Sequence, residues 1–281
     1  MNLELLQSLR IPVVEQQYAF KDSILYALGL GYGEDPLDPA QLQFVYEERQ
    51  QAVPSMCVVL GYPGFWLRDA VLGVDWVRML HAEHSFTLHR PLKPAGSVRS
   101  EHSITAVVDK GAGKGALLYV EKKLFDEQGP LATILQTLFL RGDGGCGSFG
   151  APPAALAATP EREPDLVAQV RTSPRAALIY RLSGDFNPVH ADPAVAKAAG
   201  FDRPILMGLC TMGIATRAAV QHLCGGNPER LRSLAVRFSK PVFPGETIEF
   251  RFYRSAEGAQ FVARSVERDI TVLERCQITV G

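Results

Sequence analysis

Residues 180–224 read YRLSGDFNPVHADPAVAKAAGFDRPILMGLCTMGIATRAAVQHLC, and this stretch decides both the fold and the site. Its first eleven residues combine a glycine, an acid, an amide, a proline and an imidazole without hydrophobic periodicity, which is typical of a loop that presents side chains. Gly184 permits an unusual turn, and the proline that follows Asn187 restricts Asn187 to extended or turn conformations. We therefore expect Asp185, Asn187 and His190 to project from one rigid loop.

Two helices are expected after this loop. Asp192 and Pro193 provide an N-cap and a proline at the first helical position, and Gly200 ends a helix of about two turns. The second helix is long and mostly buried, because apolar residues recur at helical spacing over 209–223. At its start near Gly208, backbone N–H groups without helical partners and the positive end of the helix dipole suit a ligand oxygen.

The composition bounds the class of protein. The chain has 281 residues, of which 47% are hydrophobic and 21% charged, and its net charge is −1, as expected for one large or two modest domains. This balance predicts neither a nucleic-acid partner nor a membrane partner. The five cysteines include no CxxC pair, so we expect reduced thiols, no metal site and a cytoplasmic location.

Strand-like segments occupy most of the remaining chain. Alternating apolar and polar residues over 85–140 and over 234–280 predict two antiparallel meanders, each preceded by helical segments. Residues 1–21 are expected to be an irregular lead-in, followed by a helix that Asp22 caps. The apolar segment 54–60 fits either a stunted helix or a buried strand.

The two meanders indicate an internal duplication. Residues 142–164 are dominated by Gly, Ala and Pro and predict the boundary. We therefore divide the chain into an N-terminal half (1–145), a linker (146–168) and a C-terminal half (169–281). The expected fold class is α+β, a double hotdog in which each antiparallel sheet wraps a helix that is long in the C-terminal half and degenerate in the N-terminal half.

Five segments carry a family resemblance: YRLSGDFNPVH (180–190), AGFDRPILMGLC (199–210), RFSKPVFPGE (237–246), LHAEHSFTLHRPLKPAG (80–96) and LRGDGG (140–145). Together they resemble the MaoC-like, (R)-specific 2-enoyl-CoA hydratases of the hydratase 2 family. The first segment is highly specific, whereas the two in the N-terminal half are supportive. The resemblance covers most of the chain and is closest to the two-hotdog hydratase domain of peroxisomal multifunctional enzymes.

The resemblance implies reversible hydration of a trans-2-enoyl-CoA to an (R)-3-hydroxyacyl-CoA, with an acyl-CoA substrate and no cofactor. It implies that Asp185 and His190 hold the reacting water, that Asn187 orients this pair, and that the Gly208 amide binds the thioester oxygen. Such relatives usually have His where this chain has Met207, which keeps the N–H donor but changes the local polarity.

The same residues also have plainer interpretations. Asp185 and Asn187 are common turn formers, His190 could only flank a helix, and Gly208 could only relieve packing. The bare chemistry supports the catalytic interpretation, since hydration of an enoyl thioester needs a base, an acid and donors for the developing oxyanion. One imidazole and one carboxylate are too few ligands for zinc.

Four residues are candidates for substrate contact. Arg237 and Lys240 could meet the phosphates of CoA, and solvated strand charges are the alternative. Met207 and Leu209 flank the expected oxygen site.

Four further polar residues are considered. His81 and Glu83 would point to the same side of a strand, with Glu83 as a structural partner or, less simply, a proton carrier. Ser183 does not lie in the nucleophile elbow of serine hydrolases, and His222 is interpreted as structural.

Alternatives to the hydratase are a hotdog acyl-CoA thioesterase and a non-catalytic acyl-CoA binding protein. Because two hotdog halves already form a pseudo-dimer, the chain is expected to be a monomer or a homodimer. The degenerate helix favours medium or long acyl chains.

Overall fold

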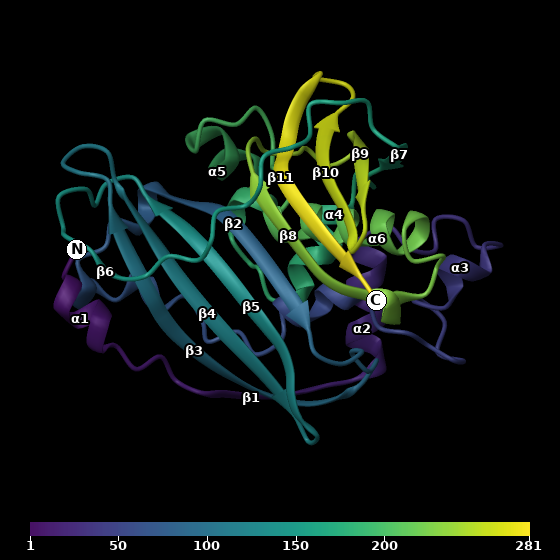
Figure 1. The fold of residues 1–281 in the computed structure, drawn as a ribbon, viewed down its shortest axis with the longest axis horizontal. Coiled ribbons are helices and arrows are strands. Elements are labelled where there is room, and N and C mark those ends of the chain that lie inside the picture. The colour runs from purple at the N-terminus through teal and green to yellow at the C-terminus, as the bar shows by residue number, and fades with distance from the viewer.

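Strands from both halves join into one 11-stranded sheet in the computed structural model, which describes residues 1–281 (Figure 1). The strand order is β1-β3-β4-β5-β2-β8-β11-β10-β9-β7, and β6 pairs with β3. The strands of the N-terminal half are β1 (Val14–Tyr18), β2 (Met79–Leu88), β3 (Gly96–Asp109), β4 (Ala116–Asp126), β5 (Gly129–Leu140) and β6 (Phe149–Gly150). Those of the C-terminal half are β7 (Leu166–Arg171), β8 (Leu231–Phe238), β9 (Thr247–Ser255), β10 (Gly258–Ser265) and β11 (Ile270–Val280).

The strand order confirms the predicted duplication. From the central seam outward, the N-terminal half runs β2, β5, β4, β3 and β1, and the C-terminal half runs β8, β11, β10, β9 and β7. Each strand except β6 therefore has a counterpart at the same place in the other half. The halves meet where β2 and β8 pair antiparallel, from Glu83 opposite Arg237 to Thr87 opposite Ser233. This arrangement is the α+β double hotdog that the sequence predicts.

The helices are short except for one. They are α1 (Leu3–Ser8), α2 (Phe20–Gly29), α3 (Pro39–Leu42), α4 (Ala176–Tyr180), α5 (Pro193–Ala198) and α6 (Gly208–His222). Short 3₁₀ helices are η1 (Pro54–Val58), η2 (Trp66–Arg68), η3 (Ala70–Leu72), η4 (Trp76–Arg78), η5 (Arg181–Ser183), η6 (Pro188–His190) and η7 (Pro228–Arg230). No helix combines the length and the hydropathy that a membrane crossing requires.

The central helix differs between the halves, as predicted. In α6 every residue from Cys210 to Val220 is buried, which matches its nearly continuous run of small and apolar side chains. Its counterpart by chain order is η1, which has five residues, begins with Pro54 and packs against α6. The apolar segment 54–60 is therefore a stunted helix and not a strand.

The beginning of the chain is more regular than predicted. The expectation of an irregular lead-in over residues 1–21 is wrong, since this region contains α1 and β1, and β1 pairs with β3. Asp22 does not precede α2 but lies in its first turn, where its carboxylate accepts a hydrogen bond from the Ala19 amide at 2.7 Å. The helix begins two residues earlier than Asp22 because this side chain reaches back to cap it.

The linker has structured ends. Phe149 and Gly150 pair with β3, and β7 begins at Leu166, whereas residues 151–165 form no helix or strand. The division at 145 and 169 remains a prediction.

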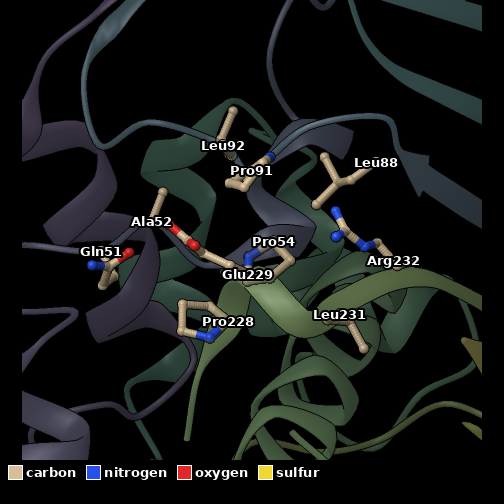
Figure 2. Close-up of a pocket in the computed structure, with 10 residues that line it drawn as sticks. All are labelled: Gln51, Ala52, Pro54, Leu88, Pro91, Leu92, Pro228, Glu229, Leu231 and Arg232. Carbon is tan, nitrogen blue, oxygen red and sulfur yellow. The ribbon is translucent and has the colours of Figure 1, made fainter. Parts of the chain in front are cut away.

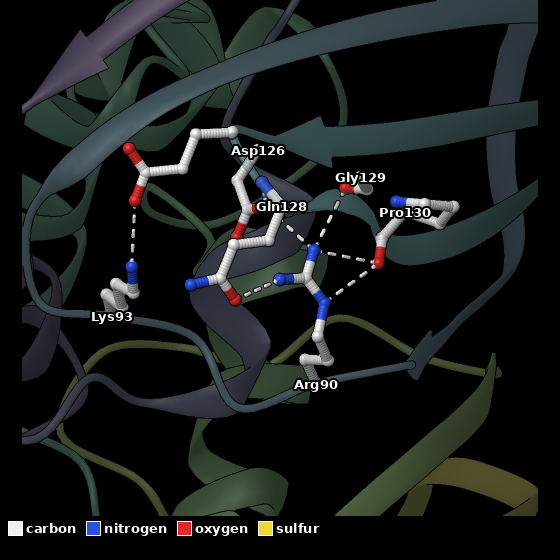
Figure 3. Close-up of polar contacts among 7 residues, drawn as sticks. Arg90, Lys93, Asp126, Gln128, Gly129 and Pro130 are labelled. Carbon is white, nitrogen blue, oxygen red and sulfur yellow. Dashed lines mark hydrogen bonds and ion pairs between the residues drawn. The ribbon is translucent and has the colours of Figure 1, made fainter.

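An arginine fastens two turns at one end of the N-terminal half (Figure 3). The Arg90 guanidinium, which follows β2, donates to the side chains of Asp126 and Gln128 at 2.7 and 2.6 Å. It also donates to the carbonyls of Gly129 and Pro130. The β2–β3 connection is thereby fixed to the β4–β5 turn.

Candidate active site

The loop between α4 and α5 is shaped by its own side chains. Gly184 ends η5 with a φ of 114°, in the left-handed region that favours glycine. The Asp185 carboxylate accepts from the Asn187 amide at 3.2 Å, and the Asn187 side-chain oxygen accepts from the Val189 amide at 3.2 Å. These two turns deliver His190 at the end of η6.

The His190 imidazole is held in one orientation. His190 is only 9% exposed, and its Nδ1 is 2.8 Å from the Ile205 carbonyl oxygen. Because a carbonyl only accepts, Nδ1 carries a proton, and in the neutral ring Nε2 is left with a free lone pair. That Nε2 lies 3.7 Å from Asp185 Oδ2, which is too long for a direct hydrogen bond but lets both atoms bind one water.

The start of α6 offers free donors. Met207 occupies the N-cap position and provides no side-chain acceptor, and the Gly208 N–H donates to no group of the protein. A β-carbon on Gly208 would lie 3.2 Å from the Phe238 ring, so the absence of a side chain has a packing reason here. The packing role is thus observed, and the oxygen-binding role of the amide remains a prediction.

The loop and the helix start meet at one end of α6. The Ile205 carbonyl that binds His190 precedes Gly208 by three residues, and the Ile205 amide donates to the Val189 carbonyl. Next to it, the Leu206 amide donates to Val242 at 2.7 Å. The structure therefore brings Asp185 and His190 to the same end of the helix as Gly208.

The remaining candidates differ in how they are engaged. Arg237 lies between two carboxylates, with Nε 3.3 Å from Glu274 and an NH group 3.8 Å from Glu83. Lys240 is exposed and forms no ion pair, Leu209 is half-buried, and Met207 is buried. Lys240 is therefore freer than Arg237 to meet an anion.

The expectation that His81 and Glu83 share one side of β2 is wrong. A register shift lies between these two residues, and it turns His81 toward His84, with ring nitrogens 3.0 Å apart. Glu83 points to the opposite face and pairs with Arg237, which makes it a structural partner.

Two aromatic residues near the site, Phe238 and Tyr62, are not among the site residues expected from the sequence. Phe238 packs against Gly208 on one side and against the His81 ring, at 4.9 Å between centroids, on the other. Tyr62 comes from the N-terminal half, and burial followed by the negative charge of Asp185 raises its pKa. The aromatic residues in the Gly- and Pro-rich segment 61–74 were the only signal for such an approach, and the alternation of β8 gave none for Phe238.

The polar residues Ser183 and His222 have no place in this chemistry. Ser183 Oγ is buried without a hydrogen-bond partner, so no base activates it. His222 is the last residue of α6, at the opposite end of the helix from Gly208. No group of three or more His, Cys, Asp and Glu side chains in the structure has the geometry to hold a metal ion.

One cavity lies at the other end of the β2–β8 seam (Figure 2). It is lined by residues that include Pro54, Leu88, Pro91 and Leu231, and its volume of about 10 Å³ holds at most one water. It belongs to the packing between η1, η7 and the end of β2, away from the loop that carries Asp185 and His190.

Comparisons with known proteins agree with this architecture. A model described as the MFE-2 hydratase 2 N-terminal domain matches residues 16–142, and one described as the MaoC like domain matches residues 155–275. The chain is 34% identical to "Enoyl-CoA hydratase 2, peroxisomal" of Arabidopsis thaliana, over 97% of this chain and 93% of that protein. The chain belongs to the MaoC-like hydratase 2 family.

Other members of this family are similar over most of the chain. The "3-hydroxyacyl-thioester dehydratase Y" of Mycobacterium tuberculosis is 39% identical over 86% of this chain and 84% of that protein. A crystal structure of a MaoC-like dehydratase from Phytophthora capsici superposes with a TM-score of 0.89 at 34% identity, covering 100% of this chain and 99% of that one.

Proposed function

We propose that the chain is a hydratase that adds water reversibly to a trans-2-enoyl-CoA to give an (R)-3-hydroxyacyl-CoA. The observation that supports this most is the facing of Asp185 and His190 across 3.7 Å, at the same end of α6 as the unpaired Gly208 N–H. Relatives named enoyl-CoA hydratase 2 and 3-hydroxyacyl-thioester dehydratase support the reaction class. The (R) stereochemistry rests on the hydratase 2 motif.

The proposed mechanism assigns one task to each group. Asp185 and His190 Nε2 hold a single water, and the pair takes its proton as the water oxygen bonds to C3 of the substrate. A proton from the pair is then delivered to C2, so that one water is consumed and the pair returns to its starting state. The charge that develops on the thioester oxygen is stabilised by the Gly208 amide and the positive end of α6.

Asn187 acts in this proposal through the loop. Its side chain caps η6, and its backbone carbonyl accepts a hydrogen bond from the His190 amide at 3.2 Å. These two contacts fix the position of the His190 backbone, from which the imidazole extends. In this proposal Asn187 orients His190 by forming the turn, so its two interpretations describe the same contacts.

The proposed substrate is an acyl-CoA, and no separate cofactor takes part. Lys240 and, after exchange of its carboxylate partners, Arg237 contact the phosphates of CoA, while Met207 and Leu209 flank the thioester. Medium or long acyl chains are favoured because the N-terminal half has only the five-residue η1 in place of a long helix such as α6, which leaves more room for the acyl chain.

The test is loss of the enoyl absorbance of crotonyl-CoA and decenoyl-CoA, with chiral analysis of the product. We expect Asp185→Asn and His190→Ala each to lower kcat by about 10²–10⁴ with an unchanged unfolding temperature. Asp202→Asn, an exposed acid that follows α5, and His222→Ala are matched controls and should keep native rates. Near-native turnover by either site variant would refute the role of that residue, and release of free thiol without hydration would refute the reaction class.

A further inference from the structure

A row of polar side chains crosses the inner face of the sheet in the N-terminal half. We call His84, Gln136, Lys122 and His102 the polar band. Their strands β2, β5, β4 and β3 are consecutive neighbours, with His84 opposite Gln136 and Lys122 opposite His102. Between β5 and β4 the band steps diagonally by two residues, because Gln136 lies opposite Val120. On β4 the inner-face residues apart from Lys122 are buried and apolar, so the band interrupts a hydrophobic series on this strand.

The band separates two hydrophobic clusters. On β4, Leu118 and Val120 belong to a small cluster that also contains residues of α1 and η3, whereas Leu124 belongs to the large cluster around α6. Lys122 lies between them. His84 and Lys122 are buried, whereas Gln136 remains partly exposed although the flanking positions on β5 are buried.

Lys122 fixes the end of η1 beside the band. Its Nζ donates to the carbonyls of Cys57, Val58 and Leu60 at 3.1, 2.8 and 2.8 Å. Burial lowers the pKa of Lys122 to about 8, so the ammonium group remains protonated at pH 7. All three of its N–H groups are used, and Lys122 has none left for a ligand.

Two imidazole nitrogens in the band lack partners. His84 is 5% exposed, its Nδ1 bonds with His81 Nε2, and its own Nε2 is buried without a hydrogen bond. The Nδ1 of His102 is buried without a partner as well. Leaving such an atom unpaired is unfavourable, so each of these nitrogens is available to a polar group.

The histidines are neutral at pH 7. Burial lowers the pKa of His84 well below its usual value and that of His81 to about 4, and the charge of Lys122 adds to this effect at His84. A neutral ring offers one donor and one acceptor, and a neutral pair has no charge with which to attract an anion. The free groups of the band are therefore suited to an uncharged ligand that both donates and accepts.

The band is continuous with the candidate active site. His81, which bonds with His84, packs on Phe238, and Phe238 packs on Gly208. Contacts between side chains thus connect the start of α6 to His84, the member of the band that lies nearest to it along this series.

We propose that the polar band is a subsite for a hydroxyl group on the acyl chain of the substrate, with the Nε2 atom of His84 as its main partner. This proposal rests on the hydratase function and extends it to a class of substrate, enoyl-CoA esters that carry a hydroxyl beyond the reacting carbons. A hydroxyl fits either tautomer of the histidine pair, because it donates to a bare nitrogen and accepts from a protonated one.

The first test compares trans-2-decenoyl-CoA with counterparts hydroxylated at one carbon from C6 to C10. We expect kcat/KM for at least one hydroxylated substrate to exceed that of decenoyl-CoA by about three- to tenfold, the worth of one neutral hydrogen bond. If all counterparts are hydrated more slowly than decenoyl-CoA, the band holds only water and the proposal is overturned. If no enoyl-CoA is hydrated at all, the failure lies with the proposed function.

The second test asks whether His84 carries the preference. His84→Leu should remove the gain of the hydroxylated substrate over decenoyl-CoA measured with the same variant, whereas His84→Gln, which keeps a donor and an acceptor, should retain part of it. Ser85→Ala, on the opposite face of β2, is the matched control and should change neither substrate. A preference that survives in folded His84→Leu would overturn the assignment, and unfolding temperatures establish that each variant is folded.

Discussion

Substituting Gly208 by alanine tests whether the thioester oxygen is bound at the start of α6. The added β-carbon would lie 3.2 Å from one carbon of the Phe238 ring and 3.4 Å from two others, so the ring must shift by a few tenths of an ångström. The ring rests on His81, which limits where it can go. The methyl group would thus occupy the space beside the N–H that the proposed mechanism uses.

The expected effect on rate follows from this geometry. Complete removal of an oxyanion donor costs about 10²–10³ in kcat, whereas the alanine variant keeps its N–H and only crowds the oxygen. We therefore expect kcat to fall about tenfold. Stability should change by less than about 1 kcal/mol, since alanine favours a helix by up to about 1 kcal/mol over glycine and this offsets the tight contact.

The assay measures kcat and KM for hydration of decenoyl-CoA together with the unfolding temperature. Gly96→Ala is the matched control, because its β-carbon would lie 3.7 Å from the Tyr18 hydroxyl, an ordinary contact, and far from the catalytic loop in the sequence. A native kcat in folded Gly208→Ala would place the oxygen elsewhere. A parallel loss of activity and stability would show that packing alone explains the glycine.

Two further predictions concern stability. Burial lowers the pKa of His81 to about 4 in the folded state, so between pH 6.5 and 4 the unfolded chain binds a proton that the folded chain does not. The unfolding free energy should therefore fall as the pH is lowered, with a share of on the order of 3 kcal/mol from His81 in addition to the shares of His84 and His102, whose pKa values burial also lowers. Urea titrations of the wild type and His81→Gln check this, since the variant should lose less by the share of His81, and an equal loss in the variant would contradict it. Arg90→Met should lower the unfolding free energy by about 2 kcal/mol, because Arg90 donates to Asp126 and to three other groups of the β4–β5 turn. The control Lys93→Met breaks only an exposed ion pair and should lower the unfolding free energy by less than about 1 kcal/mol. Equal effects of the two substitutions would refute the anchoring role of Arg90.

The C-terminal half could be predicted closely because its signals are local. Gly184, Asn187 and Asp192 act on residues within three positions of themselves, so the turns and the start of α5 follow from the sequence alone. The distance from Asp185 to His190 does not follow in this way, because it depends on the hydrogen bond from His190 to Ile205, fifteen residues later.

The errors lie where a contact distant in the sequence decides. The strand β1 has a polar sequence and exists because β3 offers it an edge. The prediction that His81 and Glu83 lie on one side of β2 is wrong because a single bulge between them reverses the alternation of side chains. No residue type in this segment indicates that bulge. The partner of Glu83 is Arg237, from the other half of the chain.

The two halves differ in the helix that lies against their sheet, and the proposed site uses both. The C-terminal half keeps α6, whose buried length places its N-terminal amides beside the catalytic loop. In the N-terminal half a helix of the same length would cover the inner face of β2 to β5 and close it with apolar side chains. The short η1 avoids this, because Lys122 binds its last carbonyls and ends it beside the polar band. If the polar band binds the substrate as we propose, the short helix and the polar residues beneath it serve the same purpose, since both provide a surface for the acyl chain in place of core packing.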